Sequence, residues 1–155
     1  MAKILVVDDD ETIRQLICIT LESLGHELNE AANGAEAITR VVELSPALVI
    51  LDVMMPEMDG WAVMRELRKR GLKTRTRVLM LTASGRETDF VDGWKLGVDE
   101  YLTKPFDPDD LVKAVESTLS LTDADIRARK MRELEKANLL SRVESAFGEG
   151  WAGEE

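Results

Sequence analysis

Hydrophobic and polar residues alternate along this chain in two distinct patterns. Short continuous apolar runs, rich in β-branched residues, stop abruptly at a polar side chain and are typical of strands buried on both faces. They predict strands over residues 3–7, 47–51, 78–81 and 98–102, with a weaker candidate over 27–31. Between these runs, apolar positions recur three and four residues apart, which indicates amphipathic helices. The expected helices cover residues 13–24, 35–44, 61–70, 87–96 and 107–121.

Five strands that alternate with five helices predict a fold of the α/β class. Such βα units form a parallel sheet with right-handed crossovers, so we expect a doubly wound five-stranded sheet with helices on both faces. The pattern closes near Leu121, and residues 1–121 are predicted to form one domain. Residues 122–155 are helical in composition and contain no proline. We expect an extra C-terminal helix there, which Gly148, Gly150 and Gly153 end in a frayed acidic tail.

The composition narrows the classes of function. The 155 residues carry 30 acidic and 20 basic side chains, for a formal net charge of −10. This charge argues against binding to nucleic acid or to a membrane surface, and it favours a cation site or a basic protein partner. Cys18 is the single cysteine, which excludes an internal disulfide. No stretch approaches the roughly 18 apolar residues of a membrane span, and no signal peptide is evident, so we expect a cytoplasmic protein.

Polar side chains with compatible chemistry follow four of the predicted strands. Asp8 and Asp9 come after the first strand, Asp52 after the third, Thr82 after the fourth and Lys104 after the fifth. Because sites in parallel sheets form at the carboxyl ends of the strands, we expect these groups to converge at one edge. Each residue alone is more often a turn residue, a helix cap or a solvated charge. These separate structural roles do not explain why residues with compatible chemistry follow four different strands.

The chemistry of this set is that of phosphoryl transfer with a divalent cation. Neighbouring carboxylates repel one another, and a hard cation such as Mg²⁺, which prefers oxygen ligands, relieves the repulsion. A carboxylate that faces the cation can attack phosphorus and become an acyl phosphate. A lysine and a threonine hydroxyl can pair with the phosphoryl oxygens, and phosphoryl transfer needs mainly such positioning and charge neutralisation.

Four segments of the chain resemble the receiver domain of bacterial two-component response regulators. They follow the family's order and lie within residues 3–120: ILVVDDDE, LDVMMPEMDG, VLMLTA and EYLTKPF. The resemblance implies a flavodoxin-like sheet with the strand order 2-1-3-4-5. It also implies a phosphorylation-driven switch, which takes its phosphoryl group from a sensor histidine kinase or a phosphotransfer protein and acts on a downstream protein target.

The resemblance assigns the acids to two roles. Asp52 is the expected phosphoacceptor. Asp52, Asp9 and the backbone carbonyl of Met54 are expected to bind Mg²⁺ directly, and Asp8 is expected to bind it through a water molecule. The reaction is the protein's own phosphorylation and dephosphorylation, so we expect no enzyme that acts on a separate substrate.

A second group of residues matches the family's switch. Thr82 is the expected switch hydroxyl, and Lys104 is the lysine that pairs with the phosphoryl group. Tyr101 matches the aromatic that turns inward when the threonine moves. The bond between Lys104 and Pro105 is expected to be cis. Phosphorylation is then expected to repack the face that the fourth helix, the fifth strand and the fifth helix form together.

Two alternatives remain open at this point. Residues 8–12 also fit the DxDxT motif of haloacid-dehalogenase-type phosphatases, in which Asp8 would be the nucleophile and Asp10 the acid–base. However, LDVMMPEMDG has no place in that motif, and the chain looks short for that fold. The other alternative is a degenerate receiver that acts as an interaction module without phosphorylation. The intact set of acids, threonine and lysine argues against it.

The segment beyond residue 121 is too short for a winged helix or a catalytic domain, so we expect no DNA-binding output domain. Its six basic and eight acidic side chains leave no net basic footprint. Apolar positions from Ile126 to Phe147 form a broad stripe, but a strict heptad register places charged residues at the seam. We expect this stripe, or the switch face, to mediate a homodimer or contact with another protein.

Overall fold

Parallel pairing joins all five strands into one sheet with the order β2-β1-β3-β4-β5. The computed structural model describes residues 1–83, 93 and 95–152 of the chain. The strands are β1 (Lys3–Val7), β2 (Glu27–Ala31), β3 (Leu48–Asp52), β4 (Arg77–Thr82) and β5 (Glu100–Thr103). The predicted fold class and strand order are therefore confirmed, and the strand bounds differ from the predicted ones by no more than two residues at any end.

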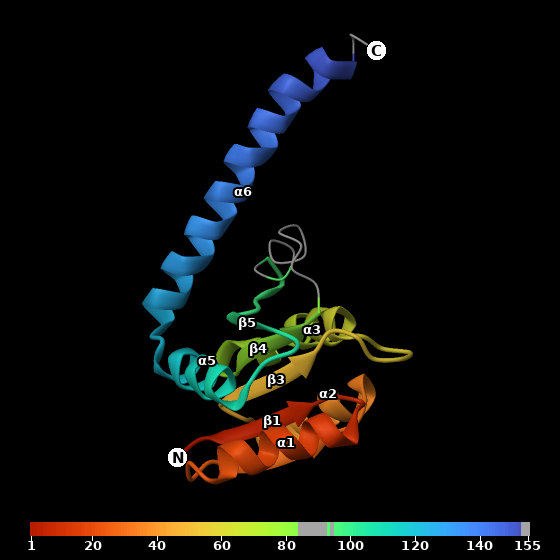
Figure 1. Ribbon diagram of the computed structural model, residues 1–155, viewed down its shortest axis with the longest axis vertical. Coiled ribbons are helices and arrows are strands. Elements are labelled where there is room, and N and C mark those ends of the chain that lie inside the picture. Colours follow the sequence, from red (N-terminus) through yellow and green to blue (C-terminus); the bar gives the residue numbers. More distant parts are fainter. Residues whose placement is uncertain (84–92, 94, 153–155) are drawn as a thin grey trace. The chain divides into compact units, whose positions relative to one another are not determined.

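Helices follow the strands and cover both faces of the sheet (Figure 1). They are α1 (Glu11–Glu22), α2 (Gly34–Leu44), α3 (Gly60–Lys69), the short 3-10 helix η1 (Leu72–Arg75), α5 (Pro108–Ser120) and α6 (Asp123–Ala152). The predicted helix over residues 87–96 lies mostly outside the described residues. Of its positions, Gly93, Lys95 and Leu96 are described, and they are helical.

Side-chain caps fix where the helices begin. An Asp or Asn side chain at the N-cap accepts a hydrogen bond from a backbone N–H of the first turn in α1, α2, α3 and α5; the capping residues are Asp10, Asn33, Asp59 and Asp107. Such caps satisfy donors that have no partner within the helix. Pro108 lies in the first turn of α5, where its missing N–H removes no helix hydrogen bond.

Alternate residues of each strand face opposite sides of the sheet, and each side packs on its own pair of helices. On one side, residues such as Leu5 and Val49 pack with α2 and α3. On the other side, Ile4 and Ile50 pack with α1 and α5. Because both faces are covered, every residue of β3 is buried. This double burial explains why the strands read as continuous apolar runs in the sequence.

The chain divides into two compact units, residues 1–121 and residues 122–155. The second unit is built on α6. A capping box fixes its start, because the Asp125 N–H donates to the Thr122 hydroxyl at 3.0 Å and the Thr122 N–H donates to Asp125 Oδ2 at 3.2 Å. Hydrogen bonds from the Thr122 backbone N–H and from the Thr122 hydroxyl to the Asp125 carboxylate lower the pKa of Asp125. Among the described residues, no helix has both the length and the apolar composition needed to cross a membrane.

Two of the three glycines that were expected to end the C-terminal helix lie within it. We expected Gly148, Gly150 and Gly153 to end the helix, but α6 runs through the first two and continues to Ala152. A glycine weakens a helix by about 1 kcal/mol, yet it keeps the backbone N–H that proline lacks, so the hydrogen-bond ladder can run through it. The last three positions of the expected acidic tail, 153–155, lie outside the described residues.

A buried ion pair holds η1 against the residue before β5. Lys73 Nζ lies 2.8 Å from Asp99 Oδ2, and the Asp99 side chain is fully buried. The same oxygen accepts a hydrogen bond from the Val78 backbone N–H at 2.8 Å. The pair therefore ties η1 to the beginnings of β4 and β5, at the edge of the sheet opposite the carboxyl ends of the strands. Sequence analysis assigned no role to Lys73 or Asp99.

Replacing Lys73 tests how much this ion pair contributes. Lys73→Met would leave the buried Asp99 carboxylate without this partner, and breaking a buried pair from one side costs about 3 kcal/mol. We expect urea unfolding to show a loss of that size in the free energy of unfolding. The control is Lys69→Met, at an exposed lysine of α3, which we expect to change the value by less than about 0.5 kcal/mol. Equal stabilities of the two variants would contradict the assignment.

Candidate functional site

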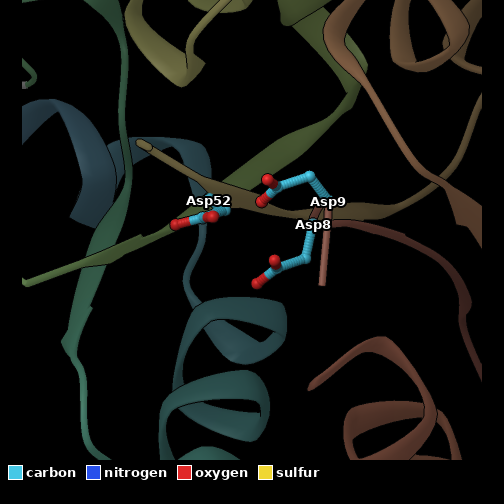
Figure 2. Close-up of side chains that lie close together, drawn as sticks. All are labelled: Asp8, Asp9 and Asp52. Atoms are coloured by element: carbon cyan, nitrogen blue, oxygen red, sulfur yellow. The ribbon is translucent and has the colours of Figure 1, made fainter. Parts of the chain in front are cut away.

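Three carboxylates meet where β1 and β3 end (Figure 2). Asp8 and Asp9 directly follow β1, and Asp52 is the last residue of the neighbouring strand β3. One carboxylate oxygen of each residue lies within 4.8 Å of the other two. Asp8 and Asp52 are buried, whereas Asp9 is exposed. The structure thus brings together the three acids that the sequence placed at two separate strand ends.

Lys104 reaches this cluster from the end of β5. Its backbone N–H donates to the Thr82 carbonyl at 2.8 Å, and the Lys104–Pro105 peptide bond is cis, as the resemblance implied. The Lys104 ammonium lies 3.0 Å from Asp8 Oδ2 and 3.2 Å from Asp52 Oδ1. A single positive charge is therefore shared between two buried carboxylates. Sequence reasoning missed the contact with Asp8, because the two residues are 96 positions apart and no local pattern links them.

The pKa values of Asp52 and Lys104 both lie above their ordinary values. Burial, and then the negative charge of Asp8, raise the pKa of Asp52 to about 6, although Lys104 and the Met54 N–H act in the opposite direction. Burial alone would lower the pKa of Lys104, but hydrogen bonds to Asp8 and Asp52 and their negative charges outweigh it and raise that pKa. Negative charge at this edge exceeds what one ammonium can offset.

The loop between β3 and α3 holds Asp52 in place. The Met54 backbone N–H donates to Asp52 Oδ1 at 3.4 Å, and the Met54 side chain is exposed. A Cβ atom on Gly60 would lie 2.5 Å from the Asp52 carbonyl oxygen, so only glycine lets α3 begin this close to β3. The Asp59–Gly60 pair of LDVMMPEMDG is therefore structural. The role of the Met54 carbonyl as a metal ligand stays a prediction.

Thr82 and Tyr101 lie on the two strands beyond Asp52. Thr82 is the buried last residue of β4. Tyr101 is partly buried in β5 and packs against the core on the side of α2 and α3. Its hydroxyl lies directly against Gly93, because a methyl group there would overlap it and would lie 3.0 Å from the Trp61 ring. The glycine makes room for the tyrosine. The switch roles of Thr82 and Tyr101 stay predictions.

The donor set of the acidic cluster suits a hard divalent cation. Carboxylates offer only oxygen ligands, which Mg²⁺ prefers, and three of them approach one another here. The two oxygens of Asp8 already accept hydrogen bonds, one from Lys104 at 3.0 Å and one from the Asp10 N–H at 2.9 Å. Asp9 is exposed and reaches the cluster from the solvent side. This arrangement fits a cation bound next to a buried nucleophilic carboxylate.

The fold and this site together define a receiver of the response-regulator type. The family model described as "Response regulator receiver domain" matches residues 4–116, which is most of the chain. The protein therefore belongs to the response regulator receiver domain family, and the resemblance drawn from the sequence is confirmed. The match also removes the support for the DxDxT phosphatase alternative.

Curated relatives and solved structures agree with this family. The chain is 37% identical over 153 residues to the DNA-binding dual master transcriptional regulator RpaA of Synechocystis, covering 99% of this chain and 64% of RpaA. It is 42% identical over 122 residues to the transcriptional regulatory protein SrrA of Staphylococcus aureus, covering 79% of this chain and 49% of SrrA. It thus spans less than two thirds of either relative. The expected absence of a DNA-binding output domain therefore stays a prediction.

Two solved receivers resemble the first unit of the protein closely. The chemotaxis response regulator CheY4 of Vibrio cholerae matches with a TM-score of 0.72 and 35% identity, over 76% of this chain and 98% of that one. The receiver domain of the Francisella response regulator 1452 matches with a TM-score of 0.71 and 34% identity, over 77% of this chain and 97% of that one.

The raised pKa of Asp52 predicts a pH-dependent stability that Asp52→Asn removes. The pKa is about 6 in the folded protein and near the ordinary 3.8 in the unfolded chain, so the folded state binds the proton more tightly. The wild type should therefore lose stability relative to the variant as pH rises from about 4 to about 6, by about 3 kcal/mol in all. Urea unfolding in a chelator measures this difference at pH 4 and pH 7.5. A difference that does not vary with pH would contradict the raised pKa.

Proposed function

We propose that this protein is a phosphoacceptor receiver that takes a phosphoryl group onto Asp52 in a Mg²⁺-dependent reaction. The observation that supports this most is the joining of Asp52 to two further carboxylates and to the Lys104 ammonium at one edge of the sheet. The donor is a sensor histidine kinase or a phosphotransfer protein, and the output is contact with a downstream protein. The reaction takes place in the cytoplasm and turns over no separate substrate.

The proposed transfer is a substitution at phosphorus. A carboxylate oxygen of Asp52 forms the new bond to phosphorus, and the bond between phosphorus and the donor breaks with its electron pair leaving on the donor. Asp52 must be ionised to attack, which its pKa of about 6 allows at neutral pH. Lys104 already lies 3.2 Å from Asp52 Oδ1, and it would pair with an oxygen of the transferred group. Thr82 would donate a hydrogen bond to another.

Mg²⁺, when bound, would offset the negative charge of the carboxylates and of the phosphoryl oxygens. Asp9, Asp52 and the Met54 carbonyl would hold it directly, and Asp8 would do so through water. Asp8 suits the indirect role because both of its oxygens already accept hydrogen bonds within the protein. Asp9 suits the direct role because it is exposed at the solvent side of the cluster.

The proposed switch starts at Lys104 and Thr82. A phosphoryl group on Asp52 would draw both side chains towards its oxygens and would change the surroundings of Tyr101 on the neighbouring strand. Tyr101 packs beside Gly93, so its movement would reach the helical segment that carries this glycine. The signalling surface would then be the face of that segment, β5 and α5. Such a local charge change biases an element that has two packing arrangements.

Labelling with acetyl phosphate tests the phosphoacceptor. We expect the wild type to gain one phosphoryl group with Mg²⁺ present and none with a chelator, as measured by intact mass. Asp52→Asn should gain none. Asp59→Asn is the matched control in the same loop, because asparagine keeps the helix cap, and it should be labelled normally. Labelling of Asp52→Asn but not of Asp8→Asn would favour the phosphatase chemistry, and an unlabelled wild type would favour a degenerate receiver.

We propose that α6 adds a surface for self-association or partner contact. Among the side chains of this helix that the structure describes, four large apolar ones are exposed: Met131, Leu139, Leu140 and Val143. Light scattering of the full chain and of residues 1–121, each with and without beryllofluoride, tests self-association. We expect a dimer only where α6 is present, and Leu140→Glu combined with Val143→Glu should abolish it. Monomers under all conditions would leave contact with another protein as the remaining role.

A second candidate output is control of transcription. It is favoured by the printed names of RpaA and SrrA, which are both transcriptional regulators. In that case the receiver would control a DNA-binding segment. The described residues do not contain such a segment as a second folded domain, because the unit that follows the receiver is built on α6. Pull-down with beryllofluoride-activated protein, compared with Asp52→Asn, tests the two outputs. Recovery of proteins by the activated form alone would favour a protein target, and recovery of DNA would favour control of transcription.

A further inference from the structure

Arg14 lies on α1 and reaches back to the loop that carries two of the three acids. Its Nη1 donates to the main-chain carbonyl oxygen of Asp8 at 2.8 Å, and its Nε donates to Glu30 Oε1 at 3.2 Å. The Arg14 side chain is only 14% exposed, although it is charged. Because a guanidinium has a rigid fork of donors, these two partners fix its orientation.

Arg14 holds both ends of the tripeptide from Asp8 to Asp10. Its guanidinium binds the Asp8 carbonyl, and its backbone N–H donates to the Asp10 carbonyl at 3.0 Å. The Asp10 N–H in turn donates to Asp8 Oδ1 at 2.9 Å, which closes the loop. Asp9 is the middle residue. The helix hydrogen bond at Asp10 and the side-chain contact at Asp8 therefore frame Asp9, and only the contact at Asp8 depends on the arginine side chain.

The position of Asp9 depends on its backbone. In the part of the chain that the structure describes, the Asp9 carboxylate makes no hydrogen bond or ion pair, yet it lies in the cluster with Asp8 and Asp52. The Asp8 carbonyl and the Asp9 N and Cα atoms belong to one planar peptide unit. A bond that fixes the Asp8 carbonyl oxygen therefore fixes the plane from which the Asp9 side chain extends.

We propose that Arg14 is a positioning residue for the cation site, which holds Asp9 towards Asp8 and Asp52 through the Asp8 carbonyl. The inference rests on the proposed function, because it assigns Mg²⁺ to these three carboxylates. It adds a residue outside the acidic cluster whose loss should weaken the site without removing a ligand.

Charge and geometry predict opposite effects of removing Arg14. By Coulomb's law alone, loss of a nearby positive charge should strengthen the binding of a cation. Loss of positioning should weaken it, since groups that orient metal ligands commonly change affinity 10- to 100-fold. A merely structural role would lower the stability of the fold and leave the Mg²⁺ affinity of the folded protein unchanged. The direction of the change in affinity therefore separates the three explanations.

Calorimetric titration of the full chain with MgCl₂ measures this affinity. We expect Arg14→Met to weaken binding by about 10-fold. Arg14→Lys keeps the charge, but its single ammonium cannot reproduce the planar fork, so we expect a loss of about 3-fold. The control is Gln15→Ala, at the next residue of α1, whose exposed side chain donates a hydrogen bond to Glu11 of the same helix; this variant should bind Mg²⁺ as the wild type does.

The outcomes decide the proposal in each case. Unchanged or tighter binding in Arg14→Met overturns it while labelling of Asp52 by acetyl phosphate stays intact, so the proposed function would survive. A wild type that binds no Mg²⁺ overturns both. If urea unfolding shows that Arg14→Met does not fold, Arg14→Lys decides: weaker binding despite the retained charge supports positioning, and equal binding contradicts it.

Discussion

Repulsion among three carboxylates, of which only Asp8 and Asp52 pair with the Lys104 ammonium, is the constraint on which this receiver depends. Parallel pairing of β1 with β3 brings the carboxyl ends of these strands together, so the carboxylates of Asp8 and Asp52 lie close to each other. Lys104 offsets part of the charge, yet the pKa of Asp52 still lies at about 6. The fold therefore maintains an edge that gains from any positive charge added to it. Phosphoryl transfer with a divalent cation uses this property directly.

Elsewhere, charged side chains make ion pairs and hydrogen bonds within the protein. Residues 65–77 contain seven basic side chains and one acidic one, which by sequence alone suggests a surface for an anionic partner. In the structure, Arg68 donates to the Lys95 carbonyl and Arg70 pairs with Glu66 at 2.7 Å. Lys73 pairs with Asp99, and Arg77 donates to the Leu121 carbonyl at 3.0 Å. Three of the seven basic side chains thus connect α3, η1 and β4 to other segments, and a fourth pairs with α3 itself.

The sequence predicted the helices, the strands and the acidic residues of the site well, because each of them has a recognisable local sequence pattern. Double burial makes each strand a continuous apolar run, and an acid that ends such a run must lie at the carboxyl edge. The pairwise contacts were not predictable in this way. Lys104 meets Asp8 across 96 positions, and Arg14 binds a main-chain carbonyl, which has no residue signature at all. The helix α6 runs past Gly148 and Gly150 because glycine lowers helix propensity without blocking the hydrogen-bond ladder.

The two edges of the sheet handle buried charge in opposite ways, and the difference locates the function. At one edge, Asp99 Oδ2 pairs with Lys73 and accepts a further hydrogen bond from the Val78 N–H, so this oxygen has partners of both kinds within the chain. At the other edge, the acids outnumber the lysine that reaches them, and Asp9 is held there by its backbone alone. A protein under selection for stability alone would have little reason to keep such an edge. Under the proposed function, a cation from outside the chain would supply the missing positive charge, and the excess acidity first visible in the sequence would be, at this edge, a binding property.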